Sequence, residues 1–403
     1  MTGRAWLSIL VLMVDSLSFC INEPTAENKA PRGTCSKAVD GVHCDENVVV
    51  GEPGQLELTR LDGVEEGYVT SLDIEPGRSL QLKTLSMKPL VFEIVDFLTT
   101  SESDHFIALA NNIGLQTSKT HSDRANKNSF TLFDQDGNRR LSLDEMKLTI
   151  ENSFDVYLDH EDIRKMYTDL DMDQDHDNEI TPDEIQKTSP ADMGEYLQKK
   201  MIQYPEKKSR FSEQVWLRPD FSTDEVFQHV QLRVQKLTKL PETLIKRSHV
   251  QVVKYGLKGH YNAHLDSTPL NTKVPCCTET TRWKGNCRIC RYMTILFYLS
   301  DVEEGGETAF PVAGNITLDE EVLRSSGNIN LFRSCHKANF KVPPKKGKAV
   351  IWYNHFINPK TDWLGEVDRF TWHGGCPVVK GEKWIANFWI RVMDTKEETE
   401  KGF

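Results

Sequence analysis

The chain has 403 residues, of which 27% are charged, and a formal net charge of −11 at pH 7. This length suggests two or three domains. The sequence contains no basic run or stripe, which argues against a nucleic-acid-binding protein. The negative charge is concentrated in residues 123–199, and the rest of the chain is close to neutral.

The N-terminus has the features of a secretory signal. Arg4 precedes a short apolar run at residues 5–14, which Asp15 ends. A membrane-spanning helix needs roughly 20 apolar residues, about twice this length. We therefore expect a signal peptide over residues 1–20, with an uncleaved signal-anchor as the alternative. Residues 21–87 are rich in Gly, Pro and charge, and are expected to form a linker or N-terminal region.

The chain has nine cysteines, and cleavage after Cys20 would leave an even number. Such a number fits disulfides in a secretory compartment, and the glycosylation sequon at Asn315 fits the same compartment. Four of the cysteines form a cluster: Cys276, Cys277, Cys287 and Cys290. The adjacent pair is awkward for tetrahedral zinc, so disulfides that pin the loop 267–290 are favoured over a zinc site. Cys335 and Cys376 either form a further bridge or remain free.

Residues 88–122 are predicted to form a strand followed by a helix that starts near Thr100. A second helix is predicted after residues 222–225, where a capping-box pattern precedes apolar residues at helical spacing. From residue 249, short β-rich runs follow one another: Val250–Tyr255, Tyr292–Leu299, Lys348–Tyr353 and Trp384–Ile390. Short strands without long intervening helices predict a barrel or jelly roll over residues 210–395.

The acidic segment contains two twelve-residue stretches that fit the EF-hand calcium loop. The candidate ligands of the first are Asp134, Asp136, Asn138, the Arg140 carbonyl and Glu145. Those of the second are Asp173, Asp175, Asp177, the Glu179 carbonyl and Glu184. The sixth position, where Gly is usual, holds Arg139 in the first loop and Asn178 in the second. Asn tolerates a left-handed backbone better, so the second loop is the stronger Ca²⁺ candidate. The alternative is a solvated acidic face that binds no metal.

Leu141 and Ile180 occupy the eighth positions of the two loops, where paired EF-hands form a short β bridge. The EF-hand pair over residues 123–200 interrupts a domain made of residues 88–122 and 210–395. The predicted fold class is therefore α+β, a double-stranded β-helix (jelly roll) with an inserted α-helical EF-hand pair.

A His-x-Asp triplet at His264 and Asp266 is followed by His373 and, ten residues later, by Lys383. Residues two apart on a strand point to the same face, so the triplet can reach one metal. Two histidines and one carboxylate form the facial triad of non-haem iron(II) oxygenases. The His-x-Asp triplet alone is common by chance. The prediction of an iron site rests on the triplet together with His373 and Lys383. Lys383 is the expected anchor for a dicarboxylate co-substrate, with Arg391 as the weaker alternative.

Ordered motifs around these residues resemble those of the prolyl 4-hydroxylases, which are 2-oxoglutarate- and Fe(II)-dependent dioxygenases. The matching segments are residues 251–256, 261–266, 292–299, 305–311, 373–378 and 381–384. The resemblance covers about residues 88–120 and 210–392. The inserted EF-hand pair is similar to the membrane-bound, endoplasmic-reticulum branch of the family rather than to its collagen or cytosolic oxygen-sensing branches.

The resemblance implies Fe(II), 2-oxoglutarate, O₂ and ascorbate as cofactors, and hydroxylation of proline at C4 in a protein substrate. It places Tyr255 and, to a lesser degree, Thr294 at the 2-oxoglutarate carboxylate. Tyr261 and Trp389 would line the proline pocket, although plain core packing explains each aromatic residue as well. The enzyme is expected to face the endoplasmic-reticulum lumen, anchored or luminal, and a homodimer is left open.

Two other functions remain open from the sequence. Hydroxylation of another side chain, such as lysine, would use the same triad. A Ca²⁺-regulated binding protein on an inactive oxygenase scaffold is the rival from another class, and the intact triad with Lys383 argues against it.

Overall fold

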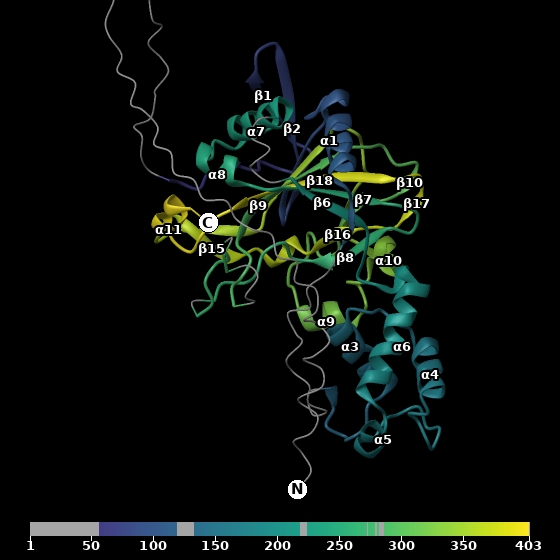
Figure 1. Cartoon of the computed structure of the whole chain (residues 1–403). Coiled ribbons are helices and arrows are strands. Elements are labelled where there is room, and N and C mark those ends of the chain that lie inside the picture. Colours follow the sequence, from purple (N-terminus) through teal and green to yellow (C-terminus); the bar gives the residue numbers. More distant parts are fainter. Residues whose placement is uncertain are drawn as a thin grey trace, which may run out of the picture.

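Two antiparallel β-sheets packed face to face form the centre of the molecule (Figure 1). The computed structural model describes residues 56–118, 133–217, 224–271, 273–278, 280–281 and 286–402. Aromatic and aliphatic side chains from both sheets, such as Tyr298, Phe310 and Trp352, form one buried cluster between them. This arrangement agrees with the predicted jelly roll.

The larger sheet has nine strands in the order β1-β2-β3-β13-β9-β18-β7-β6-β4. In that order they are β1 (Val69–Glu75), β2 (Arg78–Met87), β3 (Leu90–Ile94), β13 (Ala349–Tyr353), β9 (Arg291–Tyr298), β18 (Lys383–Arg391), β7 (Val250–Tyr255), β6 (Glu213–Leu217) and β4 (Gln116–Thr117). The smaller sheet contains β12 (Phe340–Val342), β11 (Thr308–Phe310), β16 (His373–Gly375), β8 (His260–His264) and β5 (Arg210–Phe211). Two strand pairs stand apart: β10 (Glu304–Gly305) with β17 (Val378–Lys380), and β14 (His355–Asn358) with β15 (Trp363–Val367).

The four strands predicted beyond residue 249 correspond to β7, β9, β13 and β18, with ends that agree within one residue. Residues 21–87, expected to form a linker or N-terminal region, contain two strands in their second half. Residues 69–87 form β1 and β2, which extend the larger sheet beside β3. The residues of β2 alternate between buried and exposed. The sequence did not indicate this strand, because the surrounding segment is rich in Gly and charged residues.

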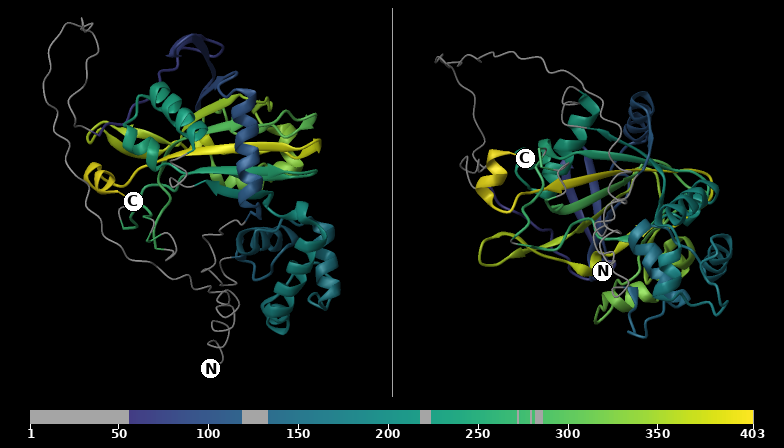
Figure 2. Two further views of the ribbon diagram at one scale, coloured as in Figure 1. Left: turned by 45° about the horizontal axis from the view of Figure 1, so that its top comes forward. Right: turned by 60° about the horizontal axis from the view of Figure 1, so that its bottom comes forward.

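Three helices cover the outer face of the larger sheet: α1 (Thr100–Ile113), α7 (Glu225–Thr238) and α8 (Glu242–Arg247) (Figure 2). The predicted start of α1 is confirmed, because Thr99 and Glu102 form a capping box around its first turn. Asp224 caps α7, while the predicted capping residues 222 and 223 lie outside the described residues. Phe106 and Phe227 meet edge to face above the sheet, with ring centroids 6.1 Å apart.

The acidic segment forms a separate helical unit with its own hydrophobic core, below the smaller sheet in Figure 1. Its elements are α3 (Leu143–Phe154), α4 (His160–Asp169), α5 (Pro182–Lys187), α6 (Pro190–Gln203) and the 3₁₀ turn η1 (Pro205–Lys207). The predicted bridge between Leu141 and Ile180 is confirmed, with N–H···O distances of 2.8 and 3.0 Å. The unit continues to Gln203, slightly beyond the predicted end at residue 200.

Short helices lie between the remaining strands: α9 (Glu320–Ser325), α10 (Leu331–Ser334), η4 (Cys335–Lys337) and η5 (Arg369–Thr371). A further short helix, α11 (Lys396–Lys401), follows the last strand. Arg333 of α10 donates to Asp159 at the N-terminus of α4 at 2.8 Å, which joins the helical unit to the sheets. Across the described ranges, no helix combines the length and apolar character needed to cross a bilayer. The predicted signal at residues 1–20 lies outside those ranges.

A buried guanidinium ties the N-terminal strands to the helices. Arg233 of α7 donates to Glu75 of β1 at 2.6 Å and to Glu102 of α1 at 2.8 Å. It also donates to the Phe97 carbonyl at 2.7 Å. Burial by itself raises the pKa of Glu102, but Arg233 and the Thr99 amide lower it below its usual value. The carboxylate is therefore ionised when the protein is folded at neutral pH.

We predict that Arg233→Met lowers the free energy of unfolding by about 3 kcal/mol, because two carboxylates lose the buried cation between them. Thermal and denaturant unfolding of both proteins would measure the difference. Lys236→Met removes an exposed charge from the same helix and is the matched control. Equal effects of the two substitutions would contradict the prediction.

Candidate active site

His264, Asp266 and His373 converge at one end of the smaller sheet, as the sequence predicts. The antiparallel pairing of β8 and β16 places His264 directly opposite His373. Nε2 of each histidine lies near the Asp266 carboxylate, at 3.6 Å for His264 and 3.5 Å for His373. One ligand atom from each of the three residues lies within 4.8 Å of the others, a spacing that fits a single metal ion.

Backbone carbonyls set the tautomer of both histidines. Nδ1 of His264 lies 2.9 Å from the Asn262 carbonyl, and Nδ1 of His373 lies 2.8 Å from the Thr371 carbonyl. A carbonyl only accepts, so Nδ1 carries the proton and Nε2 keeps its lone pair. Burial lowers the pKa of His373 to about 4, which keeps the ring neutral at physiological pH. Neutral imidazole and carboxylate are the donors that Fe(II) takes in a facial triad, so the residues fit that metal.

Asp266 is buried and held by several donors. Its Oδ2 accepts hydrogen bonds from the Thr294 hydroxyl at 2.7 Å and from the Trp389 indole at 3.0 Å. Burial by itself raises the pKa of Asp266, yet the two histidines and Arg291 hold it well below its usual range. The carboxylate is therefore ionised and fixed in orientation before any metal binds.

Lys383 is buried on β18, a strand of the larger sheet. Among the described residues, no hydrogen bond or ion pair reaches its ammonium, which faces the rings of Tyr255 at 5.3 Å and Tyr298 at 5.6 Å. Burial lowers the pKa of Lys383 to about 7, with Glu307 opposing the shift. A buried cation without an anion is unfavourable, so this position suits the carboxylate of a small dianion. Arg391, the alternative anchor, donates to the Cys277 carbonyl instead.

The two predicted tyrosines flank the triad and Lys383. Tyr255 lies directly opposite Lys383 in the pairing of β7 with β18. The Tyr261 ring stacks on the His264 imidazole with centroids 3.8 Å apart, and Arg210 covers it at 4.6 Å. Burial raises the pKa of Tyr261 to about 12, so its hydroxyl stays a donor at neutral pH.

Thr294 and Trp389 contact the candidate metal ligand directly. The Thr294 hydroxyl donates to Asp266 and accepts from the Asn354 amide at 2.9 Å. The Trp389 ring packs under Arg291, whose guanidinium carbon lies 3.6 Å from the ring centroid. The predicted roles of Thr294 at 2-oxoglutarate and of Trp389 at the proline stay predictions. Their contacts indicate that both residues orient Asp266. The sequence analysis missed Asn354 and Arg291, because no motif distinguishes them.

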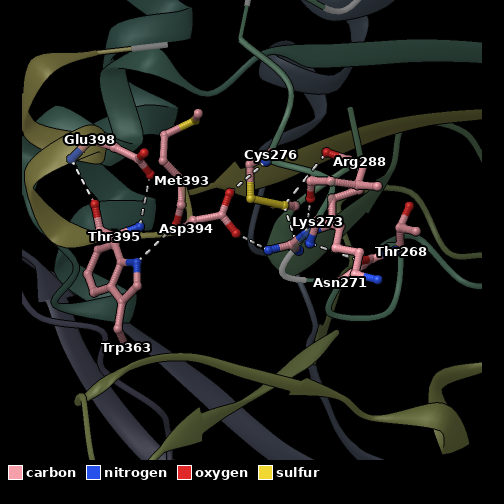
Figure 3. A network of polar contacts seen from close by, with 12 residues as sticks. Thr268, Asn271, Lys273, Cys276, Arg288, Trp363, Met393, Asp394, Thr395 and Glu398 are labelled. Atoms are coloured by element: carbon pink, nitrogen blue, oxygen red, sulfur yellow. Dashed lines mark hydrogen bonds and ion pairs between the residues drawn. A yellow bond between two sulfur atoms is a disulfide. The ribbon is translucent and has the colours of Figure 1, made fainter. Parts of the chain in front are cut away.

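The loop between β8 and β9 is cross-linked. Disulfides join Cys276 to Cys290 and Cys277 to Cys287, which confirms the expectation of disulfides rather than a zinc site. Figure 3 shows Arg288 and Asp394 side by side, joined by an ion pair, while the Cys276 amide donates to the same carboxylate at 2.7 Å. The loop is thus fixed to the segment that follows β18.

A third disulfide joins Cys335 to Cys376. Cys335 begins η4, directly after α10, and Cys376 directly follows β16. The bond therefore ties the short helices α10 and η4, which lie beside the acidic helical unit, to the strand that carries His373.

Each acidic loop brings carboxylates together. The groups are Asp134, Asp136 and Glu145 in the first loop, and Asp173, Asp175 and Glu184 in the second. Arg139 and Asn178, at the sixth positions, have φ of 64° and 66°, so both loops make the left-handed turn. The Arg140 guanidinium pairs with Asp177 and Glu179 of the other loop.

The chain was compared with protein-family profiles and with known proteins. The profile of the 2OG-Fe(II) oxygenase superfamily matches residues 250–391, the part that carries the triad and Lys383. The transmembrane prolyl 4-hydroxylase of Mus musculus is 36% identical over 355 residues, which are 83% of this chain and 70% of that protein. The human enzyme of the same name is 35% identical over 361 residues, 85% of this chain and 71% of that one.

Among solved structures, the viral collagen prolyl hydroxylase of Paramecium Bursaria Chlorella virus-1 is 22% identical, covers 75% of this chain and 95% of its own, and has a TM-score of 0.34. The fold and site define a 2-oxoglutarate- and Fe(II)-dependent oxygenase. The chain belongs to the prolyl 4-hydroxylase family, the family of those mouse and human enzymes, and is a prolyl 4-dioxygenase.

We predict that Thr294→Val weakens Fe(II) binding by about 10- to 100-fold, because Asp266 loses a donor that orients it. Thr294→Ser keeps the hydroxyl and should bind iron nearly as tightly as wild type. Anaerobic Fe(II) titration of the three proteins measures the difference. Wild-type affinity in the valine variant would show that the Trp389 donor alone is sufficient.

Proposed function

We propose that the enzyme hydroxylates C4 of proline in a protein substrate, with Fe(II) held by His264, Asp266 and His373. The observation that carries this proposal is the grouping of two histidines and an ionised aspartate near a buried lysine whose ammonium forms no ion pair or hydrogen bond among the described residues. Iron bound there would supply the activation of O₂ that this hydroxylation needs. Ascorbate would act as the reductant that returns oxidised iron to the ferrous state.

The protein's own residues bind and orient the reactants. Lys383, with Tyr255 across the strand pair, would hold the distal carboxylate of 2-oxoglutarate through a charge-assisted hydrogen bond. Thr294 and Trp389 would keep Asp266 in place. Tyr261, stacked on His264, would line the proline pocket together with the Trp389 ring. The buried walls exclude water, which strengthens each electrostatic contact inside.

We also propose that the two acidic loops bind Ca²⁺. In each loop, the backbone N–H at the sixth position donates to the carboxylate at the first position. Arg139 donates to Asp134 at 2.9 Å, and Asn178 donates to Asp173 at 2.9 Å. The bridge between Leu141 and Ile180 couples the loops, as in paired EF-hands. A left-handed backbone is less favourable at Arg139 than at Asn178, so we expect the second loop to bind more tightly.

A short route of contacts supports coupling of Ca²⁺ to substrate access. Helix α3 begins at the first loop and ends at Asp155, which accepts from the Ser209 hydroxyl at 2.5 Å. The Ser209 carbonyl accepts from the backbone N–H of Asn262 at 2.7 Å. The backbone carbonyl of Asn262 in turn orients His264. We infer that Ca²⁺ shapes the site through this route and takes no part in the chemistry.

The proposed location is the endoplasmic reticulum, with the catalytic unit facing the lumen. Three disulfides fit an oxidising compartment. Asn315 of the sequon lies next to the exposed Ile316 and would carry the glycan. Membrane anchorage through residues 1–20 is part of the same proposal.

We predict that His373→Ala abolishes succinate release from 2-oxoglutarate in the presence of Fe(II), ascorbate and a proline peptide, because the triad loses a ligand. Mass spectrometry of the peptide should show one added oxygen on proline with wild type only. His229→Ala, an exposed histidine on α7, is the matched control. Oxygen added to lysine would favour the alternative substrate, and iron or 2-oxoglutarate that fails to bind wild type would favour the inactive scaffold.

We predict that Glu184→Gln weakens Ca²⁺ binding at the second loop by about tenfold or more, since the loop loses a charged ligand. The KM for the peptide should rise with it, while the KM for 2-oxoglutarate stays unchanged. Calorimetric Ca²⁺ titration and steady-state kinetics measure both effects. Glu195→Gln on α6 removes an exposed carboxylate as the control. Unchanged peptide kinetics in Glu184→Gln and under chelation would refute the coupling.

A further inference from the structure

A cavity of about 500 Å³ lies outside the triad, between the N-terminal strands and the β14–β15 hairpin. Arg60, the β2–β3 turn with Lys88, and the segment around η5 form its walls. Phe356 and Met87 expose 47% and 42% of their surface there, so the cavity opens to solvent with an apolar rim.

The charge of this cavity opposes that of the whole chain. Its lining contains three cations, Arg60, Lys88 and Arg369, and one carboxylate, Asp368. Arg369 is paired with Glu320 at 3.3 Å. In the described ranges, Arg60 and Lys88 make no ion pair with a carboxylate, although the chain carries a net charge of −11. The lining of this cavity therefore carries an excess of positive charge in an acidic protein.

Aromatic rings and backbone carbonyls hold both cations in place. The Lys88 ammonium lies 4.0 Å from the Phe370 ring centroid and donates to the Ile316 carbonyl at 3.0 Å. The Arg60 guanidinium lies 4.6 Å over the Tyr353 ring and 5.4 Å from that of Phe356. Asp368 is the one carboxylate of the lining and interacts electrostatically with both cations, so the lining keeps an excess of positive charge that can attract an anion.

The inner wall of the cavity contacts the residues that position the triad. Asp368 donates from its amide to the Asn354 carbonyl at 2.9 Å, and Asn354 binds the Thr294 hydroxyl. The Asp368 carbonyl accepts from the Thr371 hydroxyl at 2.6 Å, and the Thr371 carbonyl orients His373. A chain seated in the cavity is thus separated from the candidate metal ligands by these few residues.

We propose that this cavity binds the segment of the substrate polypeptide that flanks the target proline, and that this segment is acidic with apolar side chains between its carboxylates. Lys88 and Arg60 would pair with the carboxylates, and the rim of Phe356 and Met87 would pack against the apolar side chains. This inference rests on the proposed prolyl hydroxylation and specifies the class of substrate.

The test uses the full-length enzyme and three peptides that share one central proline and leucines. Their remaining flanking positions carry Glu, Gln or Lys. Wild type should show a KM about fivefold lower for the Glu peptide than for the Gln peptide. This factor corresponds to the upper range of the free energy that an exposed ion pair contributes. Lys88→Gln should remove most of this preference, and Lys88→Glu should shift it toward the Lys peptide. Lys199→Gln on α6, outside the cavity, should leave it unchanged.

Fluorescence anisotropy of the labelled Glu peptide measures binding without turnover, and the preference gained by Lys88→Glu distinguishes a specific effect from misfolding. Equal KM and affinity for the Glu and Gln peptides in wild type, with proline hydroxylated in both, would overturn the docking inference and leave the proposed function intact. Charge-dependent binding through Lys88 without any hydroxylation would support the docking inference and count against the proposed function.

Discussion

The site depends on the pairing of β8 with β16, two short antiparallel strands far apart in sequence. Their register places His264 opposite His373. A slip of one residue would turn one histidine to the other face of the sheet. The backbones approach so closely here that a Cβ on Gly374 would lie 2.4 Å from the Tyr261 carbonyl oxygen. Glycine at that position is therefore a requirement of the strand pair that brings the triad together.

Asp266 and Lys383 are both buried near the β8–β16 strand pair, but their surroundings differ. Asp266 accepts hydrogen bonds from Thr294 and Trp389, so its orientation is fixed by protein groups. In the described part of the chain, no hydrogen bond or ion pair reaches the ammonium of Lys383, which faces the rings of Tyr255 and Tyr298. A fold selected for stability alone would neutralise such a cation, since its burial is unfavourable. The contrast matches a preformed metal site beside a site for an anionic co-substrate.

The surroundings of this centre connect it to the periphery on two sides. On one side, the route through Asp155, Ser209 and Asn262 leads from the helical unit to His264. On the other side, Asn354 and Asp368 lead from the positively charged cavity to the same site. Both routes combine side-chain and main-chain hydrogen bonds, and both end at residues that orient the histidines or Asp266. The proposed Ca²⁺ loops and the proposed substrate cavity would thus both be connected to the residues around the triad.

The sequence by itself determined the chemistry: the triad, Lys383, the two acidic loops, the cysteine cluster and four central strands. The His-x-Asp triplet, the acidic loops, the cysteine cluster and the strands are local patterns, which depend on spacing along the chain. His373 and Lys383 are distant from the triplet, and the ordered motifs around them identified them. Tertiary structure alone decided that residues 69–87 join the larger sheet, that Thr294 and Trp389 contact Asp266, and that Arg60 and Lys88 share a cavity. These contacts join residues that are distant in sequence, and only the packing of the folded chain brings such residues together.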